Sequence, residues 1–600
     1  MQAIILAAGM GKRLGKLTQD NTKCMVKVNG VSLIERLLGQ IDDRDLSRIV
    51  IVAGYKGKEL KDYVSTLKVK TPIVFVDNPY YETTNNIYSL YLAKDYLCQE
   101  DTLLFESDLI FEDSVIDLLI NDKRKTLVLV DKYESWMDGT CVRLGDDCTI
   151  DSFVPKKSFD YRESDKYYKT VNIYKFGKSF SKDTYVPFLE AYTKAFGKNE
   201  YYEEVLRAIA IVGDSEIRAE ILNGQLWYEI DDIQDLDIAS TLFSTDLDEK
   251  LTMLQDRYGG YWRYPKLIDF CYLVNPYYPP ERMVDEMKSN YGTLLTQYPS
   301  GMGVNSLLAG KNFGVDRSNI VVGNGAAELI KSMMESMKGK VGFIRPTFEE
   351  YINRYSKDES VYYCPDNEDY SYDADDIIGF FDKKRISTLV LVNPDNPSGN
   401  YIDKEGLMKL VDWTKKKKIR FILDESFVDF ADEEDSTLID QEILDGNPHL
   451  YVIKSISKSY GVPGLRLGVL ASGDVKLIES VKKDVSIWNI NSFAEFYLQI
   501  ESKYKSDYIE AMRKFRKERA RYISELEKIP YLRVIPSQAN YVMAEVKGRK
   551  AKDLVKSLLV RYDILIKDLT KKTNGKEFVR IAIRDRKDND KLIAALKKEQ

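Results

Sequence analysis

The stretch QAIILAAGMGKR, residues 2–13, decides the fold of the first half of the chain. An apolar run leads directly into Gly9 and Gly11, which is typical of a buried strand that ends in a glycine turn. Glycines at the end of a strand let backbone N–H groups approach a phosphate closely. The stretch therefore predicts either an anion-binding loop or an ordinary tight turn between a strand and a helix.

Two well-known phosphate loops do not fit the residues around this turn. Leu14 stands where a dinucleotide-binding fingerprint needs its third glycine or alanine. A P-loop is excluded because the spacing from Gly11 to Gly15 is one residue too short and no Ser or Thr follows Lys16. The two glycines alone therefore do not identify the ligand of this turn.

Further apolar runs of strand length alternate with helix-length segments along the whole chain. They read RIVIVAGY, TPIVFVDN, DTLLFESD and KTLVLVD in the first half, and NIVVGNG, KVGFIRP, STLVLVNP, IRFILDES and LYVIKS in the second. Such alternation indicates parallel sheets covered by helices. Because a chain of 600 residues is too long for one hydrophobic core, we expect two α/β domains, each with its own sheet.

The boundary between them is expected at residues 244–262, where a helical segment ends at Gly259 and Gly260. A loop inside one domain is the alternative, but different sets of motifs lie on the two sides. The predicted organisation is a first domain at 1–243, a linker helix at 244–262 and a second domain at 263–600. A smaller subdomain is expected to begin at about residue 505.

Composition excludes several classes of function. A net charge of −7 argues against a general nucleic-acid or membrane-surface binder. The six cysteines form no CxxC pair, so neither a zinc site nor a disulfide framework is expected. The start has no basic stretch before its apolar run, and no apolar run approaches about 20 residues, so a cytoplasmic location is expected. The single histidine, His449, leaves catalysis to Lys, Asp, Arg and cofactors.

Three segments of the first half resemble known nucleotidyltransferases. LAAGMGKRLG (6–15) followed by NTKCMVKVNG (21–30) resembles the signature of sugar-phosphate and choline-phosphate nucleotidyltransferases, and TTNNIYSL (83–90) resembles choline-phosphate cytidylyltransferases. The resemblance implies a Rossmann-like, GT-A-like domain whose glycine loop wraps CTP, with Lys23 as a catalytic cation. The nucleotide-binding residues that it implies are Leu6, Ala7, Ala8, Gly9, Gly11, Arg13, Lys23, Asn85 and Asn86.

The same resemblance implies a magnesium site. FESDLIF (105–111) puts Asp108 at the end of an apolar strand, and WYEIDDIQDL (227–236) matches the family's closing motif through Asp231. Taken alone, each aspartate is equally well explained as a cap or a turn residue. Attack of a phosphate or phosphonate oxygen on the α-phosphorus of CTP develops charge that Mg²⁺, Lys and Arg stabilise, and it needs no covalent nucleophile.

The acceptor of this reaction is expected to carry an amine. In choline-phosphate enzymes aromatic rings hold the cationic head group, which makes candidates of Trp136, Tyr174, Trp227 and Tyr228. Ordinary packing is the alternative, because 12% of the residues are aromatic. A primary ammonium would also need a carboxylate, and Asp138 and Glu229 lie nearby in the sequence.

Four segments of the second half carry reactive residues in a fixed order. They are STLVLVNPDNPSGN (387–400), IRFILDESFVDF (419–430), YVIKSISKSYGVPGLRLGVL (451–470) and FVRIAIR (578–584). The ordered set resembles fold-type-I pyridoxal-phosphate (PLP) aminotransferases, especially the branch of histidinol-phosphate aminotransferases and threonine-phosphate decarboxylases. This resemblance covers most of residues 263–600.

The resemblance assigns a role to each of these residues. Lys458 would bind PLP covalently and shuttle a proton, while Asp424 would keep the pyridine nitrogen protonated. Asn396 would donate to the ring hydroxyl, and Tyr351 would stack on the ring. The cofactor phosphate would be held by Ser455, Ser457, Arg466 and the backbone of Gly325 and Ala326. Tyr298 matches a tyrosine that reaches the cofactor of the other subunit, which implies a homodimer.

Two positions depart from the aminotransferase pattern and leave the reaction open. Phe427 stands where the family often has a tyrosine next to the cofactor ring, so decarboxylation stays an alternative. Lys567 stands where histidinol-phosphate enzymes carry an arginine, and it would meet a phosphonate or phosphate unless it is a surface lysine. Arg580 is retained and suits a contact with the carboxylate of alanine or pyruvate.

One compound could be both the product of the second domain and the substrate of the first. The second domain would make 2-aminoethylphosphonate from phosphonoacetaldehyde with alanine as donor, and the first would convert it to its CMP ester. The architecture resembles the fused 2-aminoethylphosphonate cytidylyltransferase/transaminases of bacterial phosphonate biosynthesis. The alternative is a phosphocholine or phosphoethanolamine cytidylyltransferase fused to a PLP-dependent decarboxylase of a phospho-amino acid or to a histidinol-phosphate-type aminotransferase.

Overall fold

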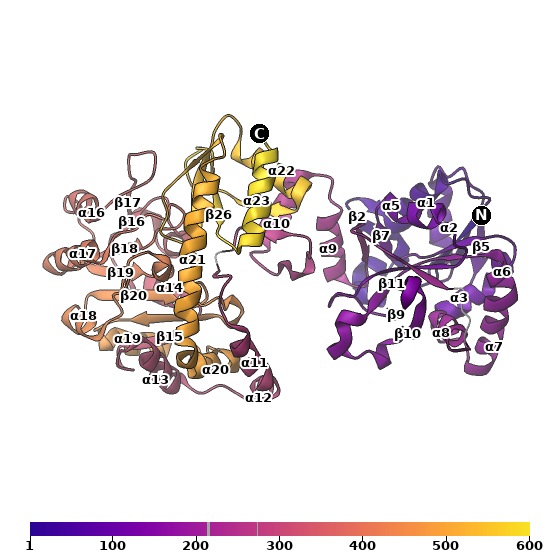
Figure 1. The fold of residues 1–600 in the computed structure, drawn as a ribbon, viewed down its shortest axis with the longest axis horizontal. Coiled ribbons are helices and arrows are strands. Elements are labelled where there is room, and N and C mark those ends of the chain that lie inside the picture. Colours follow the sequence, from indigo (N-terminus) through magenta and orange to yellow (C-terminus); the bar gives the residue numbers. More distant parts are fainter. Residues whose placement is uncertain (213–216, 273) are drawn as a thin grey trace. The chain divides into compact units, whose positions relative to one another are not determined.

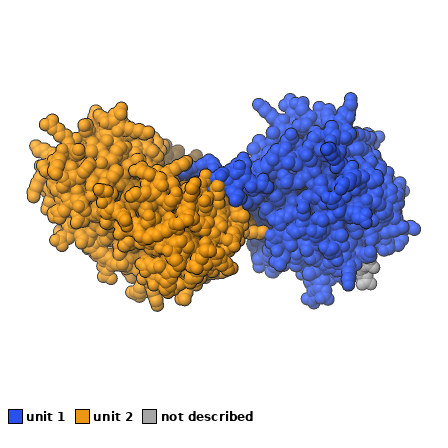
Figure 2. Space-filling view, turned by 90° about the horizontal axis from the view of Figure 1, so that it is seen from above, with its two compact units in different colours: residues 1–263 blue, residues 264–600 orange. Residues whose placement is uncertain are grey.

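The computed structural model describes residues 1–212, 217–272 and 274–600 and divides them into two compact units. The first unit runs from Met1 to Arg263 and the second from Tyr264 to Gln600. Figures 1 and 2 show the two units, each of which is described by itself below. Both combine sheets with helices, so the predicted α/β class is confirmed. Among the helices of the described residues, none is both long and apolar enough to cross a membrane.

The first unit is built on a nine-stranded mixed sheet in the order β10-β9-β11-β6-β1-β4-β5, with β8 pairing β11 and β12 pairing β8. Its strands are β1 (Gln2–Ala7), β4 (Ile49–Ala53), β5 (Ile73–Asp77), β6 (Thr102–Glu106), β8 (Leu127–Lys132), β9 (Cys141–Leu144), β10 (Ile150–Val154), β11 (Tyr168–Phe176) and β12 (Arg218–Ile221). Strands β6, β1, β4 and β5 are parallel, whereas β11 runs antiparallel to β6 and β8. The sheet is therefore mixed rather than wholly parallel.

Helices cover both faces of this sheet (Figure 1). One face buries α1 (Leu33–Asp42), α2 (Gly57–Thr66) and α5 (Asp113–Asn121), and the other buries α3 (Asn86–Leu92), α7 (Val186–Phe196) and α8 (Glu203–Val212). A two-stranded ribbon, β7 (Leu109–Phe111) with β13 (Trp227–Glu229), continues from β6. Helices α9 (Ile233–Leu242) and α10 (Leu247–Asp256) follow and pack on each other.

The second unit contains a seven-stranded sheet in the order β15-β21-β20-β19-β18-β16-β17. Its strands are β15 (Ile320–Asn324), β16 (Val341–Ile344), β17 (Ser360–Tyr363), β18 (Thr388–Val392), β19 (Arg420–Asp424), β20 (Leu450–Ser455) and β21 (Leu467–Ala471). All neighbours are parallel except β21, which is antiparallel to β15 and β20. Asp424 and Ser455 end adjacent parallel strands, which brings two of the expected cofactor ligands to one edge of the sheet.

Helices on both faces bury the second sheet as well. They include α13 (Met302–Phe313), α14 (Ala326–Ser336), α15 (Glu349–Asn353), α16 (Ala374–Phe381), α17 (Lys404–Lys417), α19 (Val475–Asp484) and α20 (Ser492–Ile500). The long helix α21 (Lys505–Leu526) leads to a four-stranded sheet, β22 (Leu532–Val534), β23 (Tyr541–Val546), β26 (Phe578–Ala582) and β25 (Lys567–Asp568). Helices α22 (Ala551–Tyr562) and α23 (Arg586–Lys598) complete the unit.

Candidate functional site

The glycine loop of the first unit has a backbone that only glycine adopts easily. Gly11 has a φ of 61°, and a Cβ built there would lie 3.0 Å from Thr18 Cγ2 and 3.1 Å from Lys23 Cβ. A side chain would therefore be strained and would also crowd the lysine. The loop brings Lys23 close to the end of β6.

Lys23 links two aspartates that are far apart in sequence. Its Nζ lies 2.5 Å from Asp108 Oδ2 and 2.7 Å from Asp231 Oδ1, and Arg13 pairs with the other oxygen of Asp231 at 2.9 Å. Burial lowers the pKa of Lys23, but the two carboxylates outweigh burial and leave the pKa raised. The lysine is therefore a permanent cation at the end of the strand.

The carboxylates around Lys23 fit a divalent metal ion. Asp108, Glu229 and Asp231 each offer an oxygen, and these oxygens lie within 4.8 Å of one another. Oδ1 of Asp108 is buried and has no hydrogen-bond partner among the described residues. A set of hard carboxylate oxygens with one unused atom suits Mg²⁺. Burial raises the pKa of Glu229 to about 7, a shift that Lys169 opposes.

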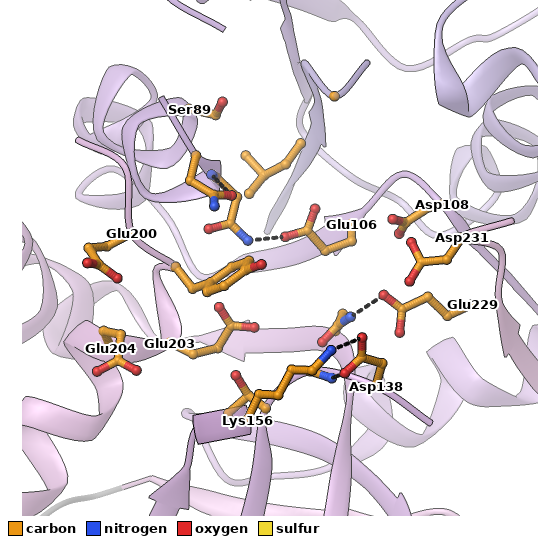
Figure 3. A pocket seen from close by; sticks show the side chains of 18 of the residues that line it. Ser89, Glu106, Asp108, Asp138, Lys156, Glu200, Glu203, Glu204, Glu229 and Asp231 are labelled. Atoms are coloured by element: carbon orange, nitrogen blue, oxygen red, sulfur yellow. Dashed lines mark hydrogen bonds and ion pairs between the residues drawn. The ribbon is translucent and has the colours of Figure 1, made fainter. Parts of the chain in front are cut away.

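These residues line one large cavity of about 870 Å³ (Figure 3). Of the expected nucleotide-binding residues, those that line it are Leu6, Ala8, Gly9, Gly11, Arg13, Lys23, Asn85 and Asn86. Ala7 is not among the lining residues, and its side chain packs in the hydrophobic core, so only its backbone could meet the nucleotide. Asn85 caps α3 by accepting from Asn86 N at 2.9 Å.

The four aromatic residues predicted to hold the acceptor do not line this cavity. Trp136 stacks on Tyr228 with ring centroids 4.2 Å apart, and Trp227 is 4% exposed and bonds Asp131 through its indole N–H at 2.7 Å. Tyr174 is completely buried in the core between the sheet and α8. The aromatic side chains that do line the cavity are Tyr81, Tyr192 and Tyr201, among residues that are mostly polar.

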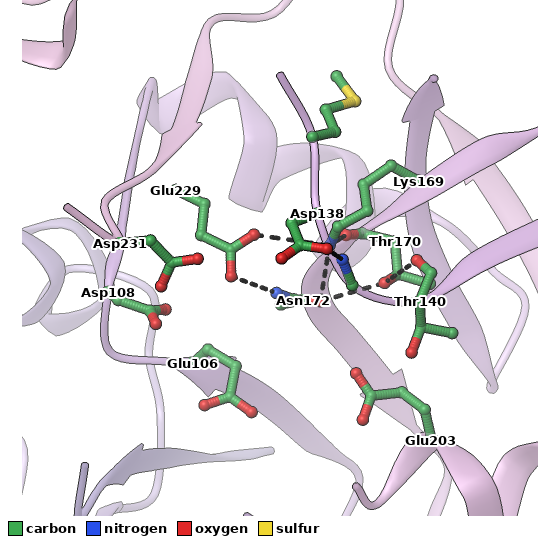
Figure 4. Close-up of polar contacts among 12 residues, drawn as sticks. Glu106, Asp108, Asp138, Thr140, Lys169, Thr170, Asn172, Glu203, Glu229 and Asp231 are labelled. Atoms are coloured by element: carbon green, nitrogen blue, oxygen red, sulfur yellow. Dashed lines mark hydrogen bonds and ion pairs between the residues drawn. The ribbon is translucent and has the colours of Figure 1, made fainter. Parts of the chain in front are cut away.

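The two predicted acceptor carboxylates lie on the cavity but in different settings. Asp138 is exposed and pairs with Lys156 at 2.7 Å. Glu229 lies beside Asp108 and Asp231 and accepts from Asn172 Nδ2 at 3.3 Å (Figure 4). Its position makes Glu229 a candidate third metal ligand, a role that the sequence analysis did not give it.

Sequence reasoning missed many of the polar residues that the structure places on this cavity. Among them are Glu106, Lys169, Asn172 and Glu203. Lys169 is 1% exposed, and its Nζ donates to Thr170 O at 2.6 Å and lies 3.6 Å from Glu229 Oε2. The one available signal was the run of polar residues inside β11, which a strand tolerates only when something polar faces it.

The second unit gathers the expected cofactor residues at the ends of its strands. Asp424 Oδ2 accepts from the hydroxyl of Tyr351 at 2.8 Å, and Oδ1 accepts from Ser426 N at 2.8 Å. Burial raises the pKa of Asp424, while these hydrogen bonds and Lys458 oppose the shift. Burial lowers the pKa of Lys458 to about 8, with Arg580 and Arg466 adding to the shift. A lysine with a lowered pKa is a better nucleophile near neutral pH.

The residues at the start of α14 have the chemistry of a phosphate-binding site. Gly325 has a φ of 73°, and a Cβ there would lie 2.4 Å from Arg466 Nη2. Gly468 is equally confined, because its Cβ would lie 2.4 Å from Ala326 N at the start of the helix. Ser457 Oγ is buried without a hydrogen-bond partner among the described residues. An arginine, an unsatisfied hydroxyl and a helix N-terminus suit the phosphate of PLP, with Ser455 buried beside them.

The structure places Tyr351 next to the cofactor-binding aspartate. Its ring is completely buried, and its hydroxyl donates to Asp424. Phe348, three residues earlier, is 38% exposed with its ring centroid 6.5 Å away. Tyr351 therefore holds the aspartate through its hydroxyl, and its stacking on the ring of PLP stays a prediction.

The remaining predicted residues divide between the site and the surface. Arg580 donates to Asn396 Oδ1 at 2.6 Å and to Cys271 O at 3.0 Å, and Lys567 is its register partner in the β25–β26 ladder. Phe427 packs edge-on against Tyr541 and is 5% exposed. Tyr298 is 80% exposed and stacks on Trp488, with ring centroids 4.6 Å apart.

Comparisons with known families agree with this division of the chain. Residues 266–596 match the family described as aminotransferase class I and II, and residues 3–138 match the MobA-like NTP transferase domain. The predicted nucleotidyltransferase and PLP-aminotransferase folds are thereby confirmed, as is the fusion of the two.

Similar proteins extend the picture. CMP-5'-(3-aminopropyl)phosphonate synthase of Streptomyces rubellomurinus is 29% identical over 99% of this chain and 94% of its own length. L-serine phosphate decarboxylase of Sulfurospirillum multivorans is 35% identical over 55% of this chain and 87% of its own length. A solved decarboxylase structure from the same organism superposes with a TM-score of 0.52 at 32% identity, covering 59% of this chain and 98% of that one. The histidinol-phosphate aminotransferase of Clostridium acetobutylicum gives a TM-score of 0.50 at 28% identity, covering 56% and 99%.

Proposed function

Because the chain belongs to the aminotransferase class I and II family and carries a MobA-like NTP transferase domain before it, we propose that it is a bifunctional enzyme of phosphonate biosynthesis. The second unit transfers the amino group of alanine to phosphonoacetaldehyde, which yields pyruvate and 2-aminoethylphosphonate. The first unit transfers CMP from CTP to that amine and releases pyrophosphate. The Streptomyces relative, named for the CMP ester of an aminopropylphosphonate and aligned along 99% of this chain, supports the link between the two steps.

The observation that carries the first half is the ion-paired group of Lys23, Asp108 and Asp231 beside the glycine loop. Asp108 and Asp231, with Glu229, would hold Mg²⁺, which when bound acts as a Lewis acid on the triphosphate. Lys23 and Arg13 neutralise charge that develops on the phosphate oxygens. Backbone N–H groups of the glycine loop position the nucleotide.

The second half depends on three charged residues. PLP, when bound, supplies the electron sink for chemistry at the Cα of the amino acid. Asp424, held by Tyr351 and Ser426, stabilises the protonated pyridine nitrogen. Lys458 moves the proton at Cα, since its pKa of about 8 lets it give and take protons near neutral pH. Arg580, held by Asn396, receives the substrate carboxylate.

A second candidate for this unit is decarboxylation of an amino acid that bears a phosphate or phosphonate. It is favoured by the relative named L-serine phosphate decarboxylase, which is 35% identical. The apolar Phe427 also places no hydroxyl beside the ring of the cofactor. In this version the first unit would accept the resulting amine, with phosphoethanolamine as an alternative to the phosphonate.

One experiment tests the first unit. The PLP-loaded full chain is incubated with CTP, Mg²⁺ and, in turn, 2-aminoethylphosphonate, 3-aminopropylphosphonate, phosphoethanolamine and phosphocholine, and pyrophosphate release is measured. We expect the highest kcat/KM with 2-aminoethylphosphonate. Equal or greater turnover of phosphocholine would refute this assignment of the acceptor.

A second experiment separates the two reactions of the PLP unit. Alanine with phosphonoacetaldehyde should give pyruvate without CO₂, whereas phosphoserine or 2-amino-4-phosphonobutyrate should give neither product at a comparable rate. Release of CO₂ without pyruvate would replace transamination by decarboxylation. The Lys458→Ala variant should abolish either reaction and leave pyrophosphate release intact.

We also propose that the second unit forms a homodimer around its exposed apolar side chains. Tyr298 and Trp488 lie among the exposed apolar residues of this unit, with Tyr291, Leu295 and Ile487. Such a group is larger than the single apolar residues that a monomer scatters over its surface. Sedimentation of the full chain should give twice the chain mass, and the double variant Tyr298→Lys/Trp488→Lys should sediment as a monomer.

A further inference from the structure

The cavity of the first unit continues past the metal-binding carboxylates to a second acidic pair. We propose that Glu203, with Glu106 beside it, binds the primary ammonium group of the acceptor. The inference rests on the proposed nucleotidyl transfer and specifies which acceptors that site takes. Figures 3 and 4 show the carboxylate of Glu106 between Asp108 and Glu203.

Glu203 is a buried carboxylate with an unused oxygen. Its residue is 6% exposed, it lines the cavity, and its Oε2 has no hydrogen-bond partner among the described residues. Oε1 accepts a hydrogen bond of 3.3 Å from the hydroxyl of the buried Tyr174. An unpaired buried carboxylate is costly, so the native complex should supply a donor. Burial raises the pKa of Glu203, and a bound ammonium would counter that shift.

Two cations that line the cavity, Lys169 and Arg207, already have partners. Lys169 donates to Thr170 O and Asn172 Oδ1 and lies beside Glu229. Arg207 pairs with Glu204 at 3.0 Å. Neither donates a hydrogen bond to Oε2 of Glu203. A cation supplied by a ligand is therefore the group that fits there.

Glu106 supplies the second carboxylate and fixes the direction of the acceptor. It ends β6 two residues before Asp108, and its Oε1 accepts from Asn86 Nδ2 at 3.0 Å. Asn86 in turn accepts from Tyr202 N at 3.0 Å, next to Glu203 in the chain. This bridge links Glu106 to the segment that carries Glu203, and Glu106 lies between Glu203 and the metal-binding carboxylates. An acceptor bound across it would direct its phosphonate toward Lys23 and its amine toward Glu203.

The pair predicts a preference for amines with N–H groups. A primary ammonium donates hydrogen bonds to carboxylate oxygens, and such charge-assisted bonds are the stronger ones. A quaternary ammonium has no N–H donor and is recognised by open aromatic faces. The rings of Trp136, Trp227 and Tyr228 pack on one another and do not line the cavity, so we expect the carboxylates rather than these rings to receive the amine.

The test is the Glu203→Gln variant in the full PLP-loaded chain. We expect KM for 2-aminoethylphosphonate to rise about 10- to 100-fold, while KM for CTP and transfer to ethylphosphonate, which lacks the amine, stay unchanged. Glu190→Gln is the matched control, because Glu190 is exposed and pairs with Lys94 on the surface. Thermal unfolding of both variants checks that they fold.

Binding measurements separate this inference from the proposed function. Calorimetric titration without CTP should show 2-aminoethylphosphonate binding to wild type at least about 10-fold tighter than ethylphosphonate, and Glu203→Gln should remove the difference. If that difference is present but no pyrophosphate is ever released, the proposed transfer fails and the ammonium site stands. An unchanged KM and affinity in Glu203→Gln, or an equal rise in the KM for CTP, would overturn the ammonium site.

Discussion

Replacing Lys23 by methionine tests whether the carboxylates around this lysine form a metal site. Its ammonium is the cation shared by Asp108 and Asp231, and Glu229 adds a third carboxylate within reach. The methionine keeps the apolar part of the side chain and removes the charge. The three acidic groups then face one another with Arg13 beside Asp231 and Lys169 beside Glu229 as the remaining counter-charges.

The stability that Lys23→Met should lose can be estimated from these contacts. Removing one partner of a buried ion pair costs about 3–5 kcal/mol. In a unit of this size that lowers the melting temperature by about 10 °C. The difference in melting temperature between Lys23→Met and wild type should become smaller as the pH falls toward about 5. A proton shared among the carboxylates then relieves their repulsion. Mg²⁺ at about 100 times its Kd should return about 2.7 kcal/mol.

Differential scanning calorimetry of the full chain measures this, and the transition that moves with CTP and Mg²⁺ is assigned to the first unit. Lys27→Met is the control, because Lys27 is exposed and lies outside the cavity. We expect Lys23→Met to be unstable without Mg²⁺, to gain more from Mg²⁺ than wild type does, and to release pyrophosphate at least about 100-fold more slowly. A variant that melts like wild type and gains nothing from Mg²⁺ would refute the argument that these carboxylates form a metal site.

Three further predictions concern the PLP unit. Gly325→Ala should weaken PLP binding by at least about 10-fold, because its Cβ would meet Arg466 at 2.4 Å and a φ of 73° is strained for alanine; fluorescence titration with PLP measures it, with Gly379→Ala as a control in open space. Tyr351→Phe removes a 2.8 Å hydrogen bond to Asp424 and should lower kcat about 10-fold without changing the affinity for PLP; an unchanged kcat would contradict the supporting role. The neutral form of Lys458 reacts with aldehydes, so its labelling in the PLP-free chain should rise with pH and reach half of its maximum at a pH of about 8, well below the usual value for lysine; a midpoint near that of ordinary lysines would disprove the lowered pKa.

The sequence was enough for the fold class because apolar runs such as AIILAAG and STLVLVNP are strands buried on both faces. The antiparallel β11 escaped notice because it buries Lys169, Thr170, Asn172 and Lys175, and a run with so many polar residues does not look like a central strand. Those residues are buried because they face the cavity or donate to backbone carbonyls, which only the tertiary structure creates.

Site residues held in ordered motifs were placed together, whereas isolated residues were not. Lys23, Asp108 and Asp231 come from separate segments and meet within hydrogen-bonding distance. Glu203 looks like an ordinary acidic residue in the first turn of an exposed helix, and nothing local marks it as buried. The two tryptophans were expected on the cavity and instead pack against other side chains, as aromatic residues often do in a core.

The two ends of the cavity require an acceptor that is a zwitterion. Lys23 and Arg13, with a metal ion on Asp108, favour an anion at one end, while Glu203 and Glu106 favour a cation beyond it. Because the two glutamates are tied to the chain through Asn86, the separation between these ends is fixed rather than adjustable. The number of carbons between phosphonate and amine should therefore decide the rate. A series of ω-aminoalkylphosphonates with one to four carbons should give a single sharp maximum of kcat/KM in wild type. In Glu203→Gln the maximum of kcat/KM should flatten, because the carboxylate that binds the amine at a fixed distance is lost. An equally sharp maximum in the variant would show that another residue determines the preferred chain length.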